Sequence, residues 1–500
     1  MRDAPLVVGL DCSTHGAKAV AFGLDGAPAA EGRAGFDLLT PAPGWYEQRA
    51  AEWERAALDA LAAIGAAAGP RVRAIGITHQ RETFVPVDAA GGALRAAIVW
   101  MDERAFAEVE ALRAALGEDR FHAITGKPLA MTPSVTKILW LRAHEPAVFA
   151  AAARWLDVGG YLARALTGAD VTSVGSAEPM GLVDLRAGRW SDAVLAAAGL
   201  AADRLPALLP VGAVAGGLTP AAAARTGLAA GTPVVVTAGD GQVAALGAQV
   251  FGLERAYLNL GTAIVAGTVA GEYRTDRAFR TMAGALPGTF LLESDLKGGT
   301  FTLDWLRERV LGGAALADLE AAAAAVPAGS EGLVLVPYLA TVMNPYWDDA
   351  ASGILVGLRG AHGPGHLMRA ALEGIALEER LHLDLIGAAA GQRIAAVHVL
   401  GGGAASDLWC QILADALDRP VTRARTTEAT ALGAAMLAAA GAGLAPSARG
   451  AAERMGGAGR AFTPGPAAPR YARLFEEVYR GLYPALRDAL GRLAAFTRGG

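Results

Sequence analysis

The stretch that decides the fold is LVVGLDCSTHGAKAVAFGL at residues 6–24. Two apolar runs flank the polar turn 11–16, so we predict an antiparallel hairpin. The same plan recurs at residues 255–268, RAYLNLGTAIVAGT, around a Gly-Thr turn. Such turns present backbone N–H groups and a hydroxyl, which together suit a phosphate. Two such hairpins, one at the start of each half, predict a duplicated α/β fold with a nucleotide held in the cleft between the halves.

Outward from the first hairpin, helical and strand patterns alternate. Ala50–Ala68 has the periodicity of a helix, whereas Arg73–Thr78 and Ala97–Trp100 read as short strands. Pro233–Ala238 is a continuous apolar run of strand length, and a helix of small residues follows it at Gln242–Gly247. This alternation is typical of α/β domains.

The second half contains another strand, loop and helix. The apolar run Val397–Leu400 leads into three glycines at 401–403, and a helix is predicted from Asp407 to Leu417. A glycine loop before a helix N-terminus is a common nucleotide-binding arrangement. The chain is predicted to end in one helix, Tyr471–Leu493, and a loose tail. We place the domain boundary so that the two domains span residues 1–247 and 248–500.

Composition limits the classes of function. The chain has 500 residues, 53% of them hydrophobic, which predicts two well-packed domains. A net charge of −5 without a Lys/Arg cluster argues against a nucleic-acid partner. The two cysteines, Cys12 and Cys410, lie far apart in the sequence and fit a reducing compartment. The N-terminal apolar run is too short for a signal peptide and no stretch reads as a membrane span, so we expect a cytoplasmic protein without a membrane partner.

The motif Gly239-Asp240-Gly241 follows a predicted buried strand. In α/β folds ligands bind at the carboxyl ends of such strands, and small flanking residues let a substrate approach the carboxylate. Asp240 is therefore a candidate base for the hydroxyl that attacks in a phosphoryl transfer. The alternative is an ordinary turn aspartate or a helix N-cap.

The turn of the first hairpin is a candidate phosphate site. Asp11 lies where it could hold Mg²⁺ through water, Thr14 and the backbone could bind phosphate oxygens, and Lys18 adds positive charge. The alternative is a plain hairpin turn with Lys18 on a solvated strand face. Gly261-Thr262 is a common turn pair, and its value comes from repeating the first hairpin.

Two further features have weaker signals. Adjacent glycines at 401–403 let the backbone pass close to a purine or a phosphate. The alternative is that the same three glycines only form a flexible loop. Arg81 and Glu82 together could fix neighbouring sugar hydroxyls, and Trp100 could form an apolar wall for the carbon chain. The alternative is a surface ion pair and a core tryptophan.

At this point the chain resembles the FGGY carbohydrate kinases over nearly its whole length, from Leu6 to Leu493. The most specific match begins with Gly353–Leu358, GILVGL, continues after seven residues with His366-Leu367, and ends with AALE at residues 370–373. Lys137–Leu141, KILWL, resembles the N-terminal signature of the family.

The resemblance implies an α/β fold of two ribonuclease-H-like domains of the actin/hexokinase type, with ATP, Mg²⁺ and a small sugar or polyol in the cleft. It implies phosphate contacts at Ser13, Thr14, His15 and Lys18 in the first hairpin and at Gly261 and Thr262 in the second, adenosine contacts at Gly402, Gly403 and Asp407, substrate contacts at Arg81, Glu82, Trp100 and Asp240, and metal-associated acids at Asp11 and Asp240. Ser13 stands where most members have a glycine.

The resemblance points to two different classes of substrate. The general run of the chain is similar to xylulokinases, which favours a ketopentose such as D-xylulose. Arg81-Glu82 instead resembles glycerol kinases and leaves glycerol or another polyol as an alternative. Thr132, Gly241 and Val265 replace bulkier residues of glycerol kinases, which suggests room for a longer substrate. Two other classes of function remain: a non-catalytic ATP- or sugar-binding sensor, and an actin-fold chaperone ATPase. For the oligomeric state, a homodimer is one expectation.

Overall fold

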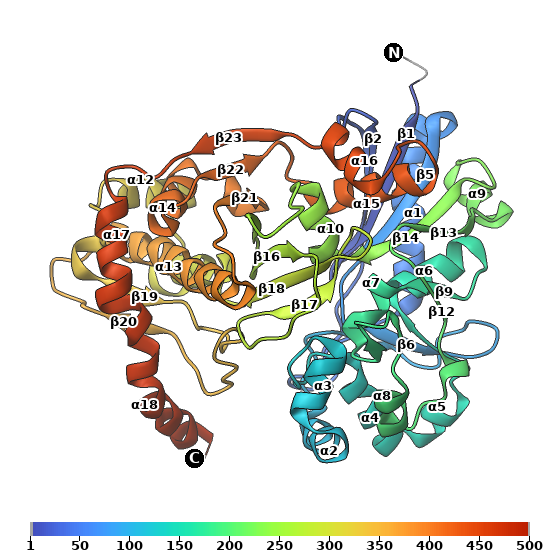
Figure 1. Cartoon of the computed structure of the whole chain (residues 1–500), viewed down its shortest axis with the longest axis horizontal. Helices are drawn as coiled ribbons and strands as arrows, with labels where there is room; N and C mark the ends of the chain where they lie inside the picture. The colour runs from blue at the N-terminus through green and yellow to red at the C-terminus, as the bar shows by residue number, and fades with distance from the viewer. Residues whose placement is uncertain (1–3, 499–500) are drawn as a thin grey trace.

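The computed structural model describes residues 4–498. Residues 1–3 and 499–500, at the outer ends of the two predicted domains, lie outside the described residues. Figure 1 shows two large sheets, the first built from the N-terminal half of the chain and the second from the C-terminal half, with helices packed around and between them.

The first sheet has six strands in the order β13-β14-β5-β1-β2-β3. Strands β1 and β2 form the predicted hairpin, in which Asp11 lies opposite Lys18. Strands β1, β5 and β14 are parallel neighbours, so their carboxyl ends meet at one edge of the sheet. The strands span Leu6–Cys12 (β1), Gly16–Gly23 (β2), Pro28–Gly35 (β3), Val72–His79 (β5), Ala213–Gly217 (β13) and Pro233–Gly239 (β14).

The second sheet has seven strands in the order β17-β18-β16-β15-β21-β22-β23. Its β15–β16 hairpin is antiparallel and β15 pairs in parallel with β21, which repeats the β2-β1-β5 arrangement of the first sheet. The predicted internal repeat is therefore confirmed. The strands span Arg255–Leu260 (β15), Ile264–Ala270 (β16), Arg280–Ala283 (β17), Phe290–Leu296 (β18), Ala396–Leu400 (β21), Val421–Ala424 (β22) and Ala458–Phe462 (β23).

A helix from the second half covers the first sheet. Helix α15 (Ala429–Gly441) packs against β1, β5 and α10 (Asp240–Gly247). Nine of its thirteen residues are alanine or glycine, so backbones approach closely: a Cβ atom at Gly9 or Gly76 would overlap a carbonyl oxygen of α15. This tight packing ties the start of α10, which carries Asp240, to both halves of the chain.

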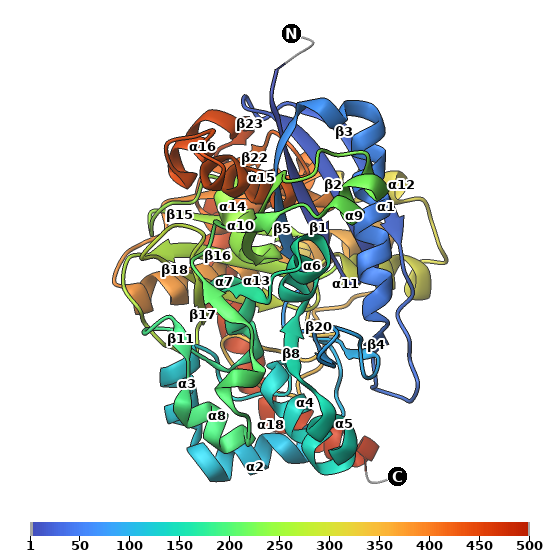
Figure 2. The same cartoon turned by 90° about the vertical axis from the view of Figure 1, so that its right-hand side faces the viewer.

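A smaller lobe extends from the first sheet. It contains the four-stranded sheet β4-β7-β6-β8 and an apolar core of its own with α2 (Phe106–Leu116), α4 (Ser134–His144) and α8 (Asp192–Ala198). The strands span Glu47–Gln48 (β4), Phe84–Val87 (β6), Ala97–Ile98 (β7) and Arg154–Asp157 (β8). The lobe lies at the lower right in Figure 1 and at the bottom in Figure 2.

Most predicted elements lie within two residues of the predicted bounds. Helices α1 (Ala50–Ala68) and α14 (Asp407–Leu417) begin and end as expected, whereas β7 stops at Ile98, two residues early. The predicted closing helix, Tyr471–Leu493, lies within a continuous helical span in which a wider turn at Phe475–Tyr479 joins α17 (Ala468–Leu474) to α18 (Arg480–Arg498). Part of the predicted loose tail is the last turn of α18.

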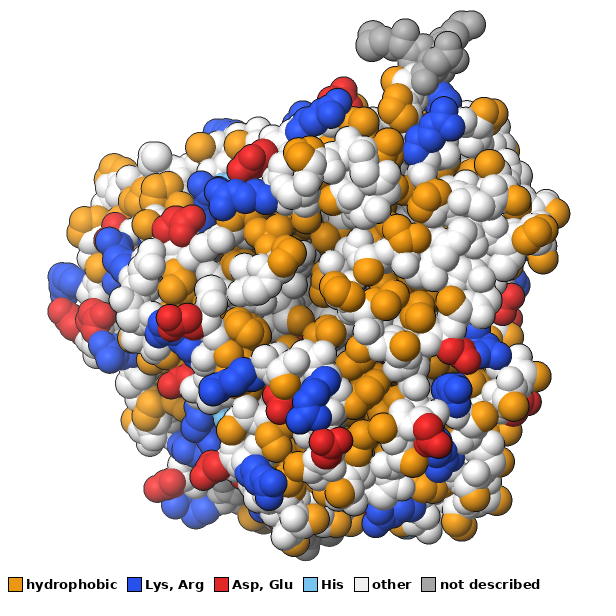
Figure 3. Space-filling model, turned by 45° about the vertical axis from the view of Figure 1, so that its right-hand side comes forward, with side chains coloured by type: hydrophobic (Ala, Val, Ile, Leu, Met, Phe, Trp, Pro, Cys, Tyr) orange, Lys and Arg blue, Asp and Glu red, His pale blue; other side chains and the backbone are white. Residues whose placement is uncertain are grey.

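The exact residue at which the first domain ends stays a prediction, because the first sheet ends at Gly239 and the second begins at Arg255. On the face drawn in Figure 3, acidic and basic side chains of the described residues are interspersed. Within residues 4–498, no helix has both the length and the apolar character that crossing a membrane requires.

Candidate active site

Asp240 is the first residue of α10, directly after β14. The N-cap position belongs to Gly239, so the Asp240 side chain is not the helix cap that the alternative interpretation required. Its Oδ1 atom accepts hydrogen bonds from the Gly241 N–H at 2.8 Å and lies 3.0 Å from Arg81 Nε. The side chain is 47% exposed. The carboxylate is therefore oriented by a cation and open to a ligand.

The glycines beside Asp240 make room for the protein's own side chains. A Cβ atom at Gly239 would lie 2.6 Å from Arg81 Cδ, and one at Gly241 would lie 2.6 Å from Glu293 Oε2. The sequence suggested that these glycines clear a path for substrate. In the structure they let Arg81 and Glu293 approach the base.

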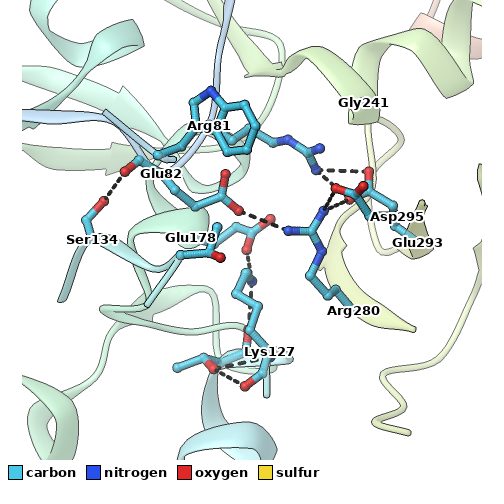
Figure 4. Close-up of polar contacts among 12 residues, drawn as sticks. Arg81, Glu82, Lys127, Ser134, Glu178, Gly241, Arg280, Glu293 and Asp295 are labelled. Carbon is cyan, nitrogen blue, oxygen red and sulfur yellow. Dashed lines mark hydrogen bonds and ion pairs between the residues drawn. The ribbon is translucent and has the colours of Figure 1, made fainter. Parts of the chain in front are cut away.

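Arg81 is buried and held by a second carboxylate. Its Nη1 atom donates to both Glu293 oxygens, at 2.8 and 2.9 Å, and Arg280 Nη2 donates to Glu293 Oε1 at 2.6 Å. Burial opposes ionisation of Glu293, but the two guanidinium groups outweigh it and hold the pKa of Glu293 below its usual value. The predicted alternative, a surface ion pair, is wrong, because these charges are buried and join the two halves (Figure 4).

Glu82 lies beside this network. Its backbone has a φ of 54°, a left-handed conformation that is uncommon for a residue with a side chain. Ser134 Oγ donates to its carbonyl oxygen at 2.9 Å, and Glu82 Oε1 is 3.5 Å from Arg280 Nη1. Burial raises the pKa of Glu82, against the attraction of Arg81 and Arg280. Strain of this kind is often found in residues that contact ligands.

Asp11 has the environment of a cation ligand. Its Oδ1 atom is shielded from solvent and has no hydrogen-bond partner among the described residues. Burial, reinforced by the charges of Asp240 and Glu428, raises the pKa of Asp11 to about 7. Within residues 4–498, no group of three or more acidic, histidine or cysteine side chains could hold a metal ion alone. Two carboxylates still fit Mg²⁺, because this ion keeps several waters and takes other ligands from phosphates.

Lys18 is already paired. It forms ion pairs with Glu428, which precedes α15, and with Glu31 at 3.6 Å. A solvated lysine was the alternative interpretation, and 19% exposure of the side chain argues against it. Glu428 was not predicted from the sequence, because it lies 410 positions away along the printed chain from Lys18.

The first turn is ordered by contacts to the smaller lobe. Ser13 closes the turn, because its backbone N–H and its hydroxyl both donate hydrogen bonds to the Gly16 carbonyl oxygen, at 2.9 and 3.0 Å. The Thr14 carbonyl accepts from Gln48 Nε2 at 2.6 Å, and Thr14 Oγ1 accepts from Trp100 Nε1 at 3.1 Å. His15 is exposed. The predicted phosphate turn and a predicted substrate residue are thus in direct contact.

Trp100 is supported by a buried lysine. Lys137 Nζ donates to the carbonyl oxygens of Trp100, at 3.1 Å, and Thr132, at 2.8 Å. Burial lowers the pKa of Lys137 to about 8. Trp100 itself is partly exposed, so it is not the core tryptophan of the alternative interpretation and is free to line a ligand site.

The second hairpin and the glycine loop adjoin each other. A Cβ atom at Gly401 would lie 2.5 Å from Asn259 Oδ1, because β15 and β21 are neighbours. The carbonyl oxygens of Gly261 and Thr262 accept from the N–H groups of Thr300 and Phe301, at 2.9 and 3.2 Å. Thr300 begins α11 (Thr300–Trp305), which was not predicted as a neighbour of this turn.

The glycine loop divides into packed and open positions. A Cβ atom at Gly403 would overlap the Trp409 ring, whereas one at Gly402 would meet nothing within 4 Å. The Asp407 carboxylate is exposed and pairs with Arg423, at 2.6 Å, and with Arg460. The hydrogen bond from Arg423 is the main reason that the pKa of Asp407 is lowered. Gly402 is thus the member of the loop whose backbone a ligand can approach.

The structure brings the predicted residues into two groups. Asp240, Arg81 and Glu82 form one group, which Asp11 joins through its charge interaction with Asp240. Gly261-Thr262 and the glycine loop form the other. Sequence reasoning missed three charged side chains of the first group: Arg280, Glu293 and Asp295. A signal was available, because FLLESDL in β18 places acidic residues at alternate positions of an otherwise buried strand.

The fold and the site together define a class of enzyme: phosphotransferases that work in the cleft between two ribonuclease-H-like halves. Comparisons with known proteins identify the family. The model of the N-terminal domain of the FGGY family of carbohydrate kinases matches residues 6–247, and the model of the C-terminal domain matches residues 256–442. The chain therefore belongs to the FGGY family of carbohydrate kinases, and the predicted fold class is confirmed.

Individual relatives support this assignment. The xylulose kinase of Escherichia coli (strain K12) is 31% identical over 437 residues, which cover 87% of this chain and 89% of the relative. A glycerol kinase of Aromatoleum aromaticum is 35% identical over 458 residues, which cover 88% of this chain and 90% of the relative. The crystal structure of xylulose kinase from Rhodospirillum rubrum matches with a TM-score of 0.90 at 32% identity, covering 97% of this chain and 99% of that chain.

Proposed function

We propose that this sugar kinase is a cytoplasmic enzyme that uses ATP and Mg²⁺ to phosphorylate a terminal hydroxyl of a ketopentose such as D-xylulose, with Asp240 as the general base. The observation that carries the proposal is the state of the Asp240 carboxylate. It is half exposed at the end of a buried strand, and Arg81 holds it by an ion pair of 3.0 Å. An oriented carboxylate that a ligand can reach is what a hydroxyl needs to lose its proton.

The chain's own residues have distinct tasks in this reaction. Asp240 accepts the hydroxyl proton on a carboxylate oxygen, and Arg81 holds that carboxylate in position through their ion pair. Asp11, with its unpartnered oxygen, is the residue best suited to hold Mg²⁺ together with Asp240. Bound Mg·ATP supplies the phosphoryl group and neutralises charge that develops during its transfer.

Nucleotide contacts follow from the two hairpins and the glycine loop. We assign phosphate binding to the backbone of the turn at Ser13–His15 and to Gly261-Thr262, and adenosine binding to the open backbone at Gly402. Lys18 contributes charge through a side chain that Glu428 and Glu31 already orient. Closure of the two proposed domains, 1–247 and 248–500, would exclude water and limit wasteful ATP hydrolysis.

Glycerol or another small polyol is the second candidate substrate. The observation in its favour is the Arg81-Glu82 pair, together with the similarity to glycerol kinases. A kinase panel over D-xylulose, L-xylulose, ribulose, glycerol and erythritol decides between the candidates. Preference for glycerol over every ketose would replace the ketopentose in this proposal.

Asp240→Asn tests the role of the base. We expect turnover to fall by about 10²- to 10⁴-fold, because a general base contributes about that much to the rate. The thermal unfolding midpoint and ATP affinity should stay near the wild-type values, since Asn keeps the size of the side chain. Asp203→Asn, on an exposed surface of the chain, is the matched control. Near-normal turnover of Asp240→Asn would refute the assignment.

An ADP-release assay tests the non-catalytic alternative. A kinase releases ADP in proportion to the sugar that it phosphorylates, whereas a sensor binds ATP and sugar without turnover. Wild-type protein that binds ketopentoses but releases no ADP with any member of the panel would favour the sensor.

A further inference from the structure

The Arg280–Asp295 pair has hydrogen-bonding capacity that nothing in the proposed reaction uses. Arg280 is in β17 and Asp295 is in β18, and Arg280 lies directly opposite Glu293 in the antiparallel pairing of these strands. Glu293 and Asp295 are two positions apart on β18, so both point to the same face of the sheet. Glu293 is bonded to Arg81 (Figure 4). Since Arg81 also pairs with the base Asp240, this face is connected to the base through Arg81.

The hydrogen bonds of the pair are incomplete. Arg280 Nη2 makes one short bond, to Glu293, but its contact with Asp295 Oδ2 is 3.5 Å, and so is the contact of Arg280 Nη1 with Glu82 Oε1. Charge-assisted hydrogen bonds are normally 2.7–2.9 Å. Among the described residues, Arg280 Nε and Asp295 Oδ1 have no partner at all, and both atoms are shielded from solvent. Unmet polar groups of this kind are costly unless a ligand or water completes them.

A hydroxyl group is the natural complement of such a pair. It accepts a hydrogen bond from a guanidinium and donates one to a carboxylate with the same oxygen atom. The Asp295 side chain is 14% exposed and that of Asp240 is 47% exposed, so each carboxylate has a part that a ligand can contact.

The charge of the cluster limits which ligands fit. Asp240, Glu82, Glu293 and Asp295 face only two guanidinium groups, so the cluster has a net charge of −2 when all are ionised. Burial raises the pKa of Glu82 and of Asp295, whereas Lys127 near Glu82 and Lys297 near Asp295 favour the ionised forms. Because more carboxylates than guanidinium groups are in direct contact, the cluster disfavours anionic sugars, such as aldonates and sugar phosphates, relative to neutral ones.

The space beside Asp295 sets the length of the ligand. Val265 of β16 lies directly opposite Asp295, and side chains of opposite residues share a face of the sheet. Val265 is partly buried and small, so more space remains beside the Asp295 side chain than an aromatic residue at position 265 would leave.

We propose that Arg280 and Asp295 bind substrate hydroxyls remote from the one that Asp240 deprotonates, and so select a neutral polyhydroxylated chain of more than three carbons. This assignment rests on the proposed function and adds specificity residues to it. Three-carbon glycerol is too short to use the remote contacts, whereas a ketopentose uses them.

Three variants test the proposal: Asp295→Asn, Arg280→Met and Val265→Phe. For each we would measure kcat and KM with D-xylulose (or the ketopentose preferred by wild type) and with glycerol. We expect kcat/KM for the ketopentose to fall by about 10- to 100-fold, mainly through KM, because hydrogen bonds to charged groups are lost. The value for glycerol should stay within about threefold for Asp295→Asn and Val265→Phe, whereas Arg280→Met, which also removes a partner of Glu293, should lower both values and the ketopentose value more. Wild type should also leave gluconate unphosphorylated.

The controls separate specificity from folding. Asp203→Asn is the matched surface variant, and thermal unfolding of each protein shows whether it is folded. If Arg280→Met does not fold, Val265→Phe decides, because it changes only the space beside Asp295. Equal losses with both substrates would overturn the proposal, since Arg280 and Asp295 would then only position Glu293 and Arg81. Unchanged ketopentose kinetics, or turnover of gluconate, would also overturn it. A wild type that phosphorylates no member of the polyol panel would instead show that the proposed function fails.

Discussion

Replacing Glu379 by glutamine should stabilise the protein, and increasingly so as the pH rises. Glu379 is on α13 (Pro364–Ala390), is completely buried and has no hydrogen-bond partner for either carboxylate oxygen among residues 4–498. The nearest positive group is His382, whose Nδ1 atom is 3.8 Å from Glu379 Oε1. Burial, together with the charges of Glu378 and Asp295, raises the pKa of Glu379 to about 8, although His382 opposes the rise.

The magnitude follows from proton linkage. The ordinary pKa is 4.5 and the folded value is about 8, so the folded chain holds a proton that the unfolded chain loses between these values. Stability therefore falls as the pH rises through this window. The linkage relation gives a cost of about 0.8 kcal/mol at pH 5 and about 3 kcal/mol at pH 7. Glutamine is neutral at both values, so its advantage over glutamate should grow by about 2.5 kcal/mol between them.

Urea unfolding followed by circular dichroism at pH 5 and pH 7 measures this difference. Groups away from Glu379 titrate in both proteins, so the change in the difference between wild type and Glu379→Gln reports Glu379 together with His382, whose pKa Glu379 helps to raise. The exposed Glu110→Gln variant is the matched control and should show no such change. A variant that loses stability relative to wild type as the pH rises would refute the reasoning, because Glu379 would then be an anion stabilised by His382.

Three further predictions concern the site itself. Asp11→Asn should abolish the tightening of nucleotide binding by Mg²⁺, measured by calorimetry with a non-hydrolysable ATP analogue, and an unchanged Mg²⁺ effect would place the ion elsewhere. Gly241→Ala should lower turnover by about tenfold or more in a folded protein, because its methyl group would displace Glu293 from Arg81; wild-type kinetics would show that the contact has no role. Gly403→Ala should destabilise the fold by about 1–3 kcal/mol through overpacking, whereas Gly402→Ala should keep the unfolding midpoint and weaken ATP binding. If Gly402→Ala instead lowered the stability and Gly403→Ala only weakened ATP binding, the roles assigned to the two glycines would have to be exchanged.

Much of the fold could be predicted from local patterns. The Leu6–Leu24 hairpin has turn residues between apolar runs, and α1 has helical periodicity along its whole length, so short-range preferences specify both. The wider turn at Phe475–Tyr479 inside the closing helix was not predicted. It places the Tyr479 hydroxyl against the Gly374 carbonyl and the Glu378 carboxylate of α13, a contact that no local sequence pattern indicates.

The candidate site could be predicted only in part. Asp240 was singled out because it follows a predicted strand, and the structure places it directly after β14. Arg81 was predicted as a substrate contact, yet its guanidinium bonds Glu293 and Asp240, which lie 212 and 159 positions further along the printed chain. Long-range charge pairing leaves no periodic pattern, so the sequence alone does not show which carboxylate an arginine meets.

By itself the sequence determined the duplicated hairpins, the strand before Asp240, the glycine loop and the family signatures, because each depends on residues close together along the chain. Only the tertiary structure decided how the two hairpins and Asp240 are surrounded: that Lys18 pairs with Glu428, that Arg81 pairs with Glu293, and that one Asp11 oxygen has no partner among residues 4–498. The physical reason is that burial and long-range contact set the charge state of a side chain. The hairpin at residues 6–24 therefore identifies the fold, and the charges that the fold gathers around Asp240 determine the chemistry.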